Sequence, residues 1–103
     1  MSIVVVATIV PIPEHRAEVI AIFETAIAEV HDEPGAELYA LHEGADRLVM
    51  IEKYESDEAL AQHGKGAALA KLGAALDGKT IGKIDVQVLT PHPAGTQEKG
   101  LLH

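Results

Sequence analysis

The stretch RLVMIEKYESDEALAQHGKG, residues 47–66, predicts a strand, a turn and a short helix in direct succession. Ser56 is suited to begin this helix, because its side-chain oxygen can accept a hydrogen bond from a backbone N–H of the first turn. The helix ends where His63 is followed by Gly64 and Gly66. A helix that only covered a sheet would need neither the histidine nor the glycines. The stretch therefore carries a candidate site as well as part of the fold.

The flanking segments extend this unit to the order βαββαβ. The β-branched run after Met1 predicts a strand buried on both faces, and apolar residues at three- and four-residue steps predict an amphipathic helix after it. The expected elements are strand 3–10, helix 14–31, a hairpin of strands 36–42 and 47–54, the interrupted helix 57–76, and strand 83–91. Split βαβ units form one antiparallel sheet with both helices on one face, so we expect an α+β, ferredoxin-like fold.

One face of such a sheet has no helix to cover it. The strand at residues 3–10 is apolar at nearly every position, so both of its faces favour burial. Burial of apolar surface stabilises by about 25 cal/mol per Å². We therefore expect a back-to-back homodimer.

Composition excludes several classes of function. The chain has 103 residues, no cysteine, and 16 acidic against 8 basic residues, for a net charge of -8. This charge opposes nucleic-acid binding, and the lack of cysteine excludes a disulfide framework or a thiolate metal site. No apolar run is long enough to span a membrane, and the N-terminal residues lack a basic leader. We expect a cytoplasmic protein with one domain at residues 1–91. Residues 92–103 form a tail that is either loose or packed on the partner subunit.

Glu52 is an unusual residue for the middle of an apolar strand. Residues two apart in a strand share a face, so Glu52 lies beside Met50 and Tyr54. A buried carboxylate needs a partner or a raised pKa. Glu52 is therefore either an acid, a base or an orienting group in a site, or a carboxylate at the sheet edge paired with a cation.

The length of the hairpin loop decides which residue of the strand 36–42 lies on the same face of the sheet as Glu52 and Tyr54. A four-residue loop places Tyr39 with Glu52 and Tyr54, whereas a three-residue loop replaces Tyr39 by His42. We favour the first arrangement, which leaves His42 near an exposed end. Either tyrosine could be a pocket wall with a hydroxyl donor, or an amphipathic core residue.

His63 is the strongest catalytic candidate, although a lone helical histidine is more often a packing or surface residue. The end of a helix favours an imidazolium, and the adjacent glycines allow close approach of a ligand. Histidine is also suited to proton transfer near neutral pH. No two histidines have the spacing of a helical metal site, so we expect no metal. The remaining histidines are interpreted as surface or cap residues: His15, His31, His42, His92 and His103.

The motifs EPGAELYALHE and RLVMIEKYESDEALAQH resemble the signature of the antibiotic biosynthesis monooxygenase (ABM) domain family. The resemblance covers about residues 3–91. It implies a dimeric α+β barrel with a small-molecule pocket between the helices and the sheet. Activities in this family include cofactor-independent oxygenation of quinol-like or polyketide aromatics, and the superfamily also holds haem-degrading oxygenases and isomerases of phosphorylated sugars.

Two departures from the family pattern narrow the expected chemistry. The haem-degrading branch uses an Asn in the first strand and a Trp at the end of the third, where this chain has Val6 and Tyr54. The chain contains no Asn and no Trp at all. We therefore expect no haem. The chain also has no cysteine, no histidines paired at a metal-binding spacing and no Gly-rich dinucleotide turn, so we expect no other cofactor.

The resulting hypothesis is a cofactor-independent monooxygenase for a small, quinol-like aromatic. His63 is the expected base, Tyr54 a hydrogen-bond partner of the substrate oxygen, and Glu52 the group that tunes one of them. The alternatives are an isomerase or lyase that uses the same acid and base, and a dimer that binds a ligand without catalysis. The expected pocket wall consists of Tyr39, Thr8, Met50 and Phe23.

Overall fold

The computed structural model describes residues 2–103 and has the predicted ferredoxin-like architecture. Its sheet has four strands in the order β2-β3-β1-β4, and every neighbouring pair is antiparallel. The elements are β1 (Ile3–Ile9), the short 3-10 helix η1 (Pro13–His15), α1 (Arg16–Val30), β2 (Ala36–Glu43), β3 (Leu48–Tyr54), α2 (Asp57–Lys65), α3 (Ala67–Leu76) and β4 (Asp85–Leu89).

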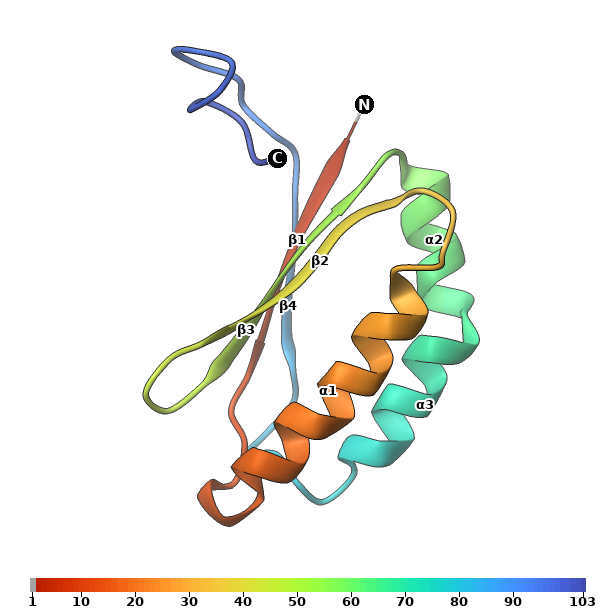
Figure 1. Ribbon diagram of the computed structural model, residues 1–103, viewed down its shortest axis with the longest axis vertical. Coiled ribbons are helices and arrows are strands. Elements are labelled where there is room, and N and C mark those ends of the chain that lie inside the picture. The colour runs from red at the N-terminus through yellow and green to blue at the C-terminus, as the bar shows by residue number, and fades with distance from the viewer. Residues whose placement is uncertain (1) are drawn as a thin grey trace.

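The helices form one layer against one face of the sheet, and the other face has none (Figure 1). Burial alternates along β1, because successive side chains of a strand point to opposite faces. Its odd-numbered residues are buried beneath the helices, together with Phe23 of α1 and Leu72 of α3. Its even-numbered residues Val4, Val6 and Thr8 lie half-buried on the helix-free face.

The hairpin adopts the register that places Tyr39 with Glu52. Tyr39 pairs directly with Glu52, and Glu43 pairs with Leu48 at the end of the hairpin. The Gly44 N–H closes the turn by donating to the Arg47 carbonyl at 2.7 Å. The prediction of a shared face for Tyr39 and Glu52 is therefore confirmed.

The helix over residues 57–76 is interrupted as the glycines predict. Ser56 caps α2, since its hydroxyl oxygen accepts a hydrogen bond from the Ala59 N–H at 3.1 Å. Gly66 has an extended conformation and separates α2 from α3. The predicted strand 83–91 is shorter in the structure, because β4 pairs only with the five residues Val4–Thr8 of β1.

The C-terminal tail folds back over one end of the helix-free face. The Lys53 ammonium of β3 donates to the Leu102 carbonyl at 3.1 Å. Leu101 and Leu102 also line a hollow together with Val4 of β1. Within residues 2–103, no helix has the length and hydrophobicity that crossing a membrane requires.

Candidate functional site

An apolar cavity of about 220 Å³ lies between the sheet and the helices α2 and α3. Its polar side chains are Tyr39 of β2, Glu52 of β3 and His63 of α2. The rest of its wall is apolar: Val5, Ala7, Ile9, Phe23, Met50, Leu60, Gly64, Leu69, Leu72, Ile84, Val86 and Val88. The cavity therefore combines a hydrophobic interior with a small cluster of groups that can exchange protons.

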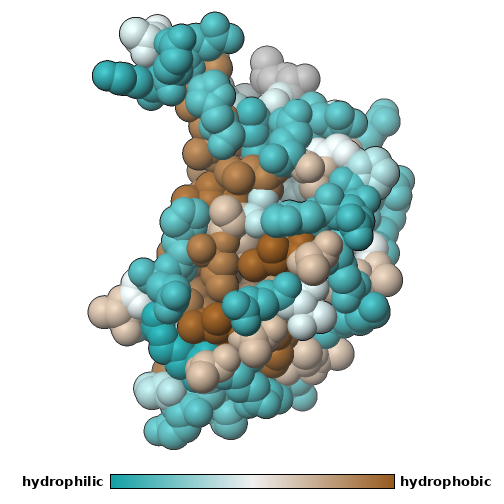
Figure 2. Space-filling model, in the orientation of Figure 1, coloured by the Kyte–Doolittle hydropathy of each residue, from teal (hydrophilic) through white to brown (hydrophobic). Residues whose placement is uncertain are grey.

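The cavity opens toward the edge strand β4. Val86 pairs with Ala7 and Val88 with Val5, so both valines share the helix-side face of the sheet. They nevertheless remain 55% and 59% exposed. Figure 2 shows hydrophobic residues gathered in a band over the strands, bordered by hydrophilic ones. A ligand can therefore reach the interior from this side.

His63 is buried at the polar end of the cavity. Its ring lies close to those of both tyrosines, with centroid distances of 5.6 Å to Tyr39 and 5.2 Å to Tyr54. Its Nε2 atom lies 4.0 Å from Glu52 Oε1, which is longer than a hydrogen bond. Outside its chain neighbours and the α2 backbone, no heavy atom lies within 4 Å of the position that a Cβ on Gly64 would take. The open space beside His63 thus depends partly on a missing side chain.

Glu52 and Tyr54 form a buried hydrogen-bonded pair. The Tyr54 hydroxyl donates to Glu52 Oε1 at 2.6 Å. Burial raises the pKa of Glu52, although the hydrogen bond from Tyr54 and the nearby His63 partly oppose this rise. Burial, together with Glu52, also raises the pKa of Tyr54 and of Tyr39, so both phenols remain protonated donors.

Glu33 is a site residue that sequence reasoning missed. It lies between α1 and β2, and its Oε1 accepts a hydrogen bond from His63 Nδ1 at 2.8 Å. The EPG motif at residues 33–35 contained a sequence signal for this contact. Gly35 has φ of +87°, and a Cβ there would lie 2.6 Å from the Cβ of Ala59 in α2. The glycine thus lets the loop pack against α2, where Glu33 reaches His63.

The structure places most predicted site residues at the cavity, with two differences. Tyr39, Met50, Phe23, Glu52 and His63 line it. Tyr54 lies behind Glu52, and its hydroxyl already donates to that carboxyl group, so it does not line the cavity. Thr8 lies on the opposite face of the sheet, with Val4 and Val6. The placement of Thr8 in the pocket wall was wrong, because an uninterrupted apolar strand does not reveal which face meets the helices.

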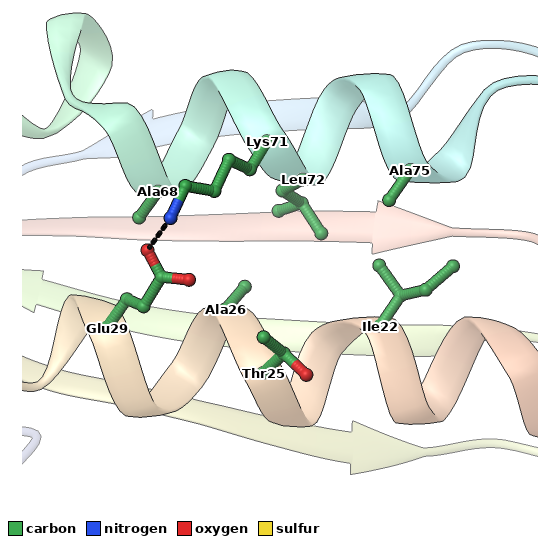
Figure 3. A pocket seen from close by; sticks show the side chains of 8 residues that line it. All are labelled: Ile22, Thr25, Ala26, Glu29, Ala68, Lys71, Leu72 and Ala75. Atoms are coloured by element: carbon green, nitrogen blue, oxygen red, sulfur yellow. Dashed lines mark hydrogen bonds and ion pairs between the residues drawn. The ribbon is translucent and has the colours of Figure 1, made fainter.

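A second groove lies between the antiparallel helices α1 and α3 (Figure 3). Its floor contains Ala26, Ala68 and Leu72, and the Lys71 ammonium pairs with Glu29 across it at 3.1 Å. Apart from this exposed ion pair, the lining offers only the Thr25 hydroxyl as a polar side chain. The groove lacks the buried proton-transfer groups of the cavity.

The cavity is suited to acid–base chemistry on a small apolar molecule. An imidazole held by a carboxylate can accept a proton at its free nitrogen. A buried carboxyl group and the phenol of Tyr39 can donate hydrogen bonds to an oxygen atom in the cavity. Among residues 2–103 there is no group of three or more His, Cys, Asp or Glu residues that could hold a metal ion.

The described residues form a small α+β domain with a cavity between its helices and its sheet. A family model described as antibiotic biosynthesis monooxygenase matches residues 2–74. The chain belongs to the antibiotic biosynthesis monooxygenase family. No curated protein matches it.

Solved structures resemble the chain over most of its length. Rv0793 from Mycobacterium tuberculosis is 26% identical with a TM-score of 0.86, and the alignment covers 93% of this chain and 100% of that one. A candidate antibiotic biosynthesis monooxygenase from Caulobacter crescentus CB15 is 30% identical with a TM-score of 0.81, over 85% and 87% of the two chains. A protein from Bacteroides thetaiotaomicron VPI-5482, suggested to be an oxidoreductase, is 19% identical with a TM-score of 0.78, over 85% and 95%. The last of these shows the fold alone.

Proposed function

We propose that the chain is a cofactor-independent monooxygenase for a small, electron-rich, quinol-like aromatic. The observation that carries this proposal is an apolar cavity with one candidate base, His63, at its polar end. An engineered cavity of about 150 Å³ binds benzene in another protein. A volume of about 220 Å³ therefore suits a substrate of one or two rings.

The lining of the cavity favours this substrate over a phosphorylated sugar. Neither Lys nor Arg is among the residues that line it, whereas two of its polar groups are Glu52 and His63. Recognition of a phosphate generally uses cationic side chains or a cluster of backbone N–H groups. The wall thus supports binding of an uncharged aromatic whose hydroxyl group points to His63.

In the proposed reaction, the substrate supplies the electrons for oxygen. His63 Nε2 removes the proton of a ring hydroxyl, and the resulting anion transfers electrons to O₂. One oxygen atom of O₂ binds a ring carbon, which loses its hydrogen and becomes a carbonyl carbon. The second oxygen atom leaves as water, together with the hydrogens from the hydroxyl group and the ring carbon. The protein binds the anion, accepts the proton and excludes water.

The geometry suggests a division of roles at the polar end. Tyr39 lines the cavity and can donate a hydrogen bond to the substrate oxygen. Glu52 can donate a second hydrogen bond in its protonated form, which burial favours. Tyr54 holds Glu52 in place.

We also propose that the active form is a cytoplasmic homodimer joined through the helix-free sheet faces. This face carries apolar residues in three adjacent strands, namely Leu38, Ala40, Val4, Val6, Val49 and Ile51. Burial of such a surface favours association of two copies. Sedimentation of the purified chain at micromolar concentration tests this, and a stable monomer would refute it.

Oxygen uptake with a panel of quinols, measured on metal-free protein, tests the proposed reaction. His63→Ala should lower turnover at least about a hundredfold, the lower range for loss of a general base. His42→Ala is the matched control, because His42 is exposed near the hairpin turn and bonds only the Ala40 carbonyl. Turnover by His63→Ala at the wild-type rate would make His63 a packing residue. A panel compound that binds in the cavity without oxygen uptake would instead indicate a binding protein.

A further inference from the structure

His63 separates two hollows in the protein. The cavity lies on one side, and a more open hollow of about 350 Å³ lies on the other, between α2 and the loop after α1. Of the described residues, His63 alone lines both. Glu52 lines only the inner cavity, and Glu33 lines only the outer hollow. The imidazole thus connects the reaction space with the surface.

The two nitrogen atoms of His63 face different carboxyl groups. Nδ1 is hydrogen-bonded to Glu33 at 2.8 Å, whereas Nε2 lies 4.0 Å from Glu52. The side chain of Glu33 is 23% exposed, against 6% for His63 and 7% for Glu52. Glu33 is therefore the member of this group that reaches water.

Glu33 lies beside the N-terminal end of α3. Its second oxygen lies 3.5 Å from the position that a Cβ on Gly66 would take, directly before α3. The N-terminal end of a helix favours negative charge. When the Glu33 oxygen accepts the hydrogen bond from Nδ1–H of a neutral imidazole, the Nε2 atom is left without a hydrogen on the cavity side.

We infer that Glu33 is the positioning residue of His63 and the proton exit of the site, an assignment that rests on the proposed function. A proton from the substrate hydroxyl binds at Nε2, the Nδ1 proton passes to the Glu33 carboxylate, and Glu33 releases it to water. These steps leave His63 in the Nε2–H tautomer. It regains the Nδ1–H tautomer when Nε2 donates its proton to the oxygen atom that leaves as water and Glu33 passes a proton from solvent back to Nδ1. No oxidation state changes in these proton transfers. The other ionisable groups around the ring are Glu52, Tyr54 and Tyr39.

Nuclear magnetic resonance of the full chain with isotope-labelled histidine tests the positioning role without a substrate. The His63 signals are identified by their loss in His63→Gln. Wild-type protein should show the Nδ1–H tautomer, and Glu33→Ala should show a mixture of the two tautomers. Glu29→Ala is the matched control, since Glu29 lines the same outer hollow but pairs with Lys71. An Nε2–H tautomer in the wild type, or an unchanged tautomer in Glu33→Ala, would overturn the inference.

Kinetics with an active quinol test the proton exit. Glu33→Ala should lower kcat about ten- to a hundredfold at unchanged KM, because a misplaced base slows the chemical step more than binding. Added formate should restore part of kcat in this variant, and Glu29→Ala should behave as the wild type. An unchanged kcat in Glu33→Ala would refute the exit. Tautomer control by Glu33 without oxygen uptake for any quinol would refute the proposed monooxygenase reaction while retaining the positioning role.

Discussion

Replacement of Gly35 by alanine should destabilise the protein strongly, because two independent costs meet at this residue. Its φ of +87° is a conformation that costs an alanine about 1–2 kcal/mol. The new methyl group would also lie 2.6 Å from the Ala59 Cβ, and overpacking of this kind costs about 1–3 kcal/mol. The sum, about 2–5 kcal/mol, is a large part of the stability of a small domain.

Gly64→Ala is the matched control for this substitution. Gly64 lies in the last turn of α2, and outside its chain neighbours and the helix backbone no heavy atom lies within 4 Å of an added Cβ. Alanine in the middle of a helix is favoured over glycine by about 0.5–1 kcal/mol, and near the end of α2 we expect part of this gain. The same chemical change should therefore destabilise at position 35 and stabilise at position 64.

Thermal and urea unfolding followed by circular dichroism, at one protein concentration, measure both effects. Gly35→Ala should lower Tm by about 10 °C or more, and Gly64→Ala should raise it by a few degrees. Combining Gly35→Ala with Ala59→Gly removes the overlap but leaves the backbone cost, so the two changes should couple by about 1–3 kcal/mol. A Tm of Gly35→Ala within 1 °C (roughly 0.2 kcal/mol) of the wild type would refute the reasoning. The loop that carries Glu33 would then not be fixed by close packing against α2.

Two further predictions concern Glu52 and the helix-free face. Because burial raises the pKa of Glu52 above 4.5, the native protein loses stability as pH rises from that value through the raised pKa, by about 1.4 kcal/mol for each unit of the rise. Glu52→Gln should avoid this loss, so its stability relative to the wild type in urea unfolding should increase as the pH rises from the ordinary carboxyl pKa through the raised pKa of Glu52; a difference that is constant with pH would contradict this. Val6→Glu should convert the proposed dimer to a monomer in sedimentation, whereas the exposed substitution Ala61→Glu in α2 should not; a Val6→Glu dimer of wild-type affinity would exclude this face as the interface.

The fold could be predicted from the sequence because each element has its own local signal. The apolar periodicity of α1, the β-branched run of β1 and the Ser56 cap all indicate elements that the structure contains. The register of the hairpin could not be decided from the sequence alone, since two loop lengths were compatible with it. The Gly44–Arg47 hydrogen bond closes the turn and brings Tyr39 opposite Glu52.

The site was harder to predict, because its partners come from distant parts of the chain. His63 and Glu52 could be selected as a helical histidine beside glycines and a carboxyl group in an apolar strand. The contact between Glu33 and His63 joins residues 30 positions apart, and no local periodicity reports it. Tyr54 was predicted to meet the substrate. A strand pattern places its side chain on the correct face but does not show that Glu52 already engages its hydroxyl.

The exposed mouth of the cavity has a consequence for the evolution of specificity. Leu69, Val86 and Val88 line the cavity but are among the exposed large hydrophobic residues. Substitutions there remove few buried contacts, so they should cost little stability compared with changes at Phe23 or Met50. Selectivity for new ligands can therefore change at these three positions while the folded state tolerates the mutations. A mutant library restricted to them would explore substrate range with little loss of folded protein.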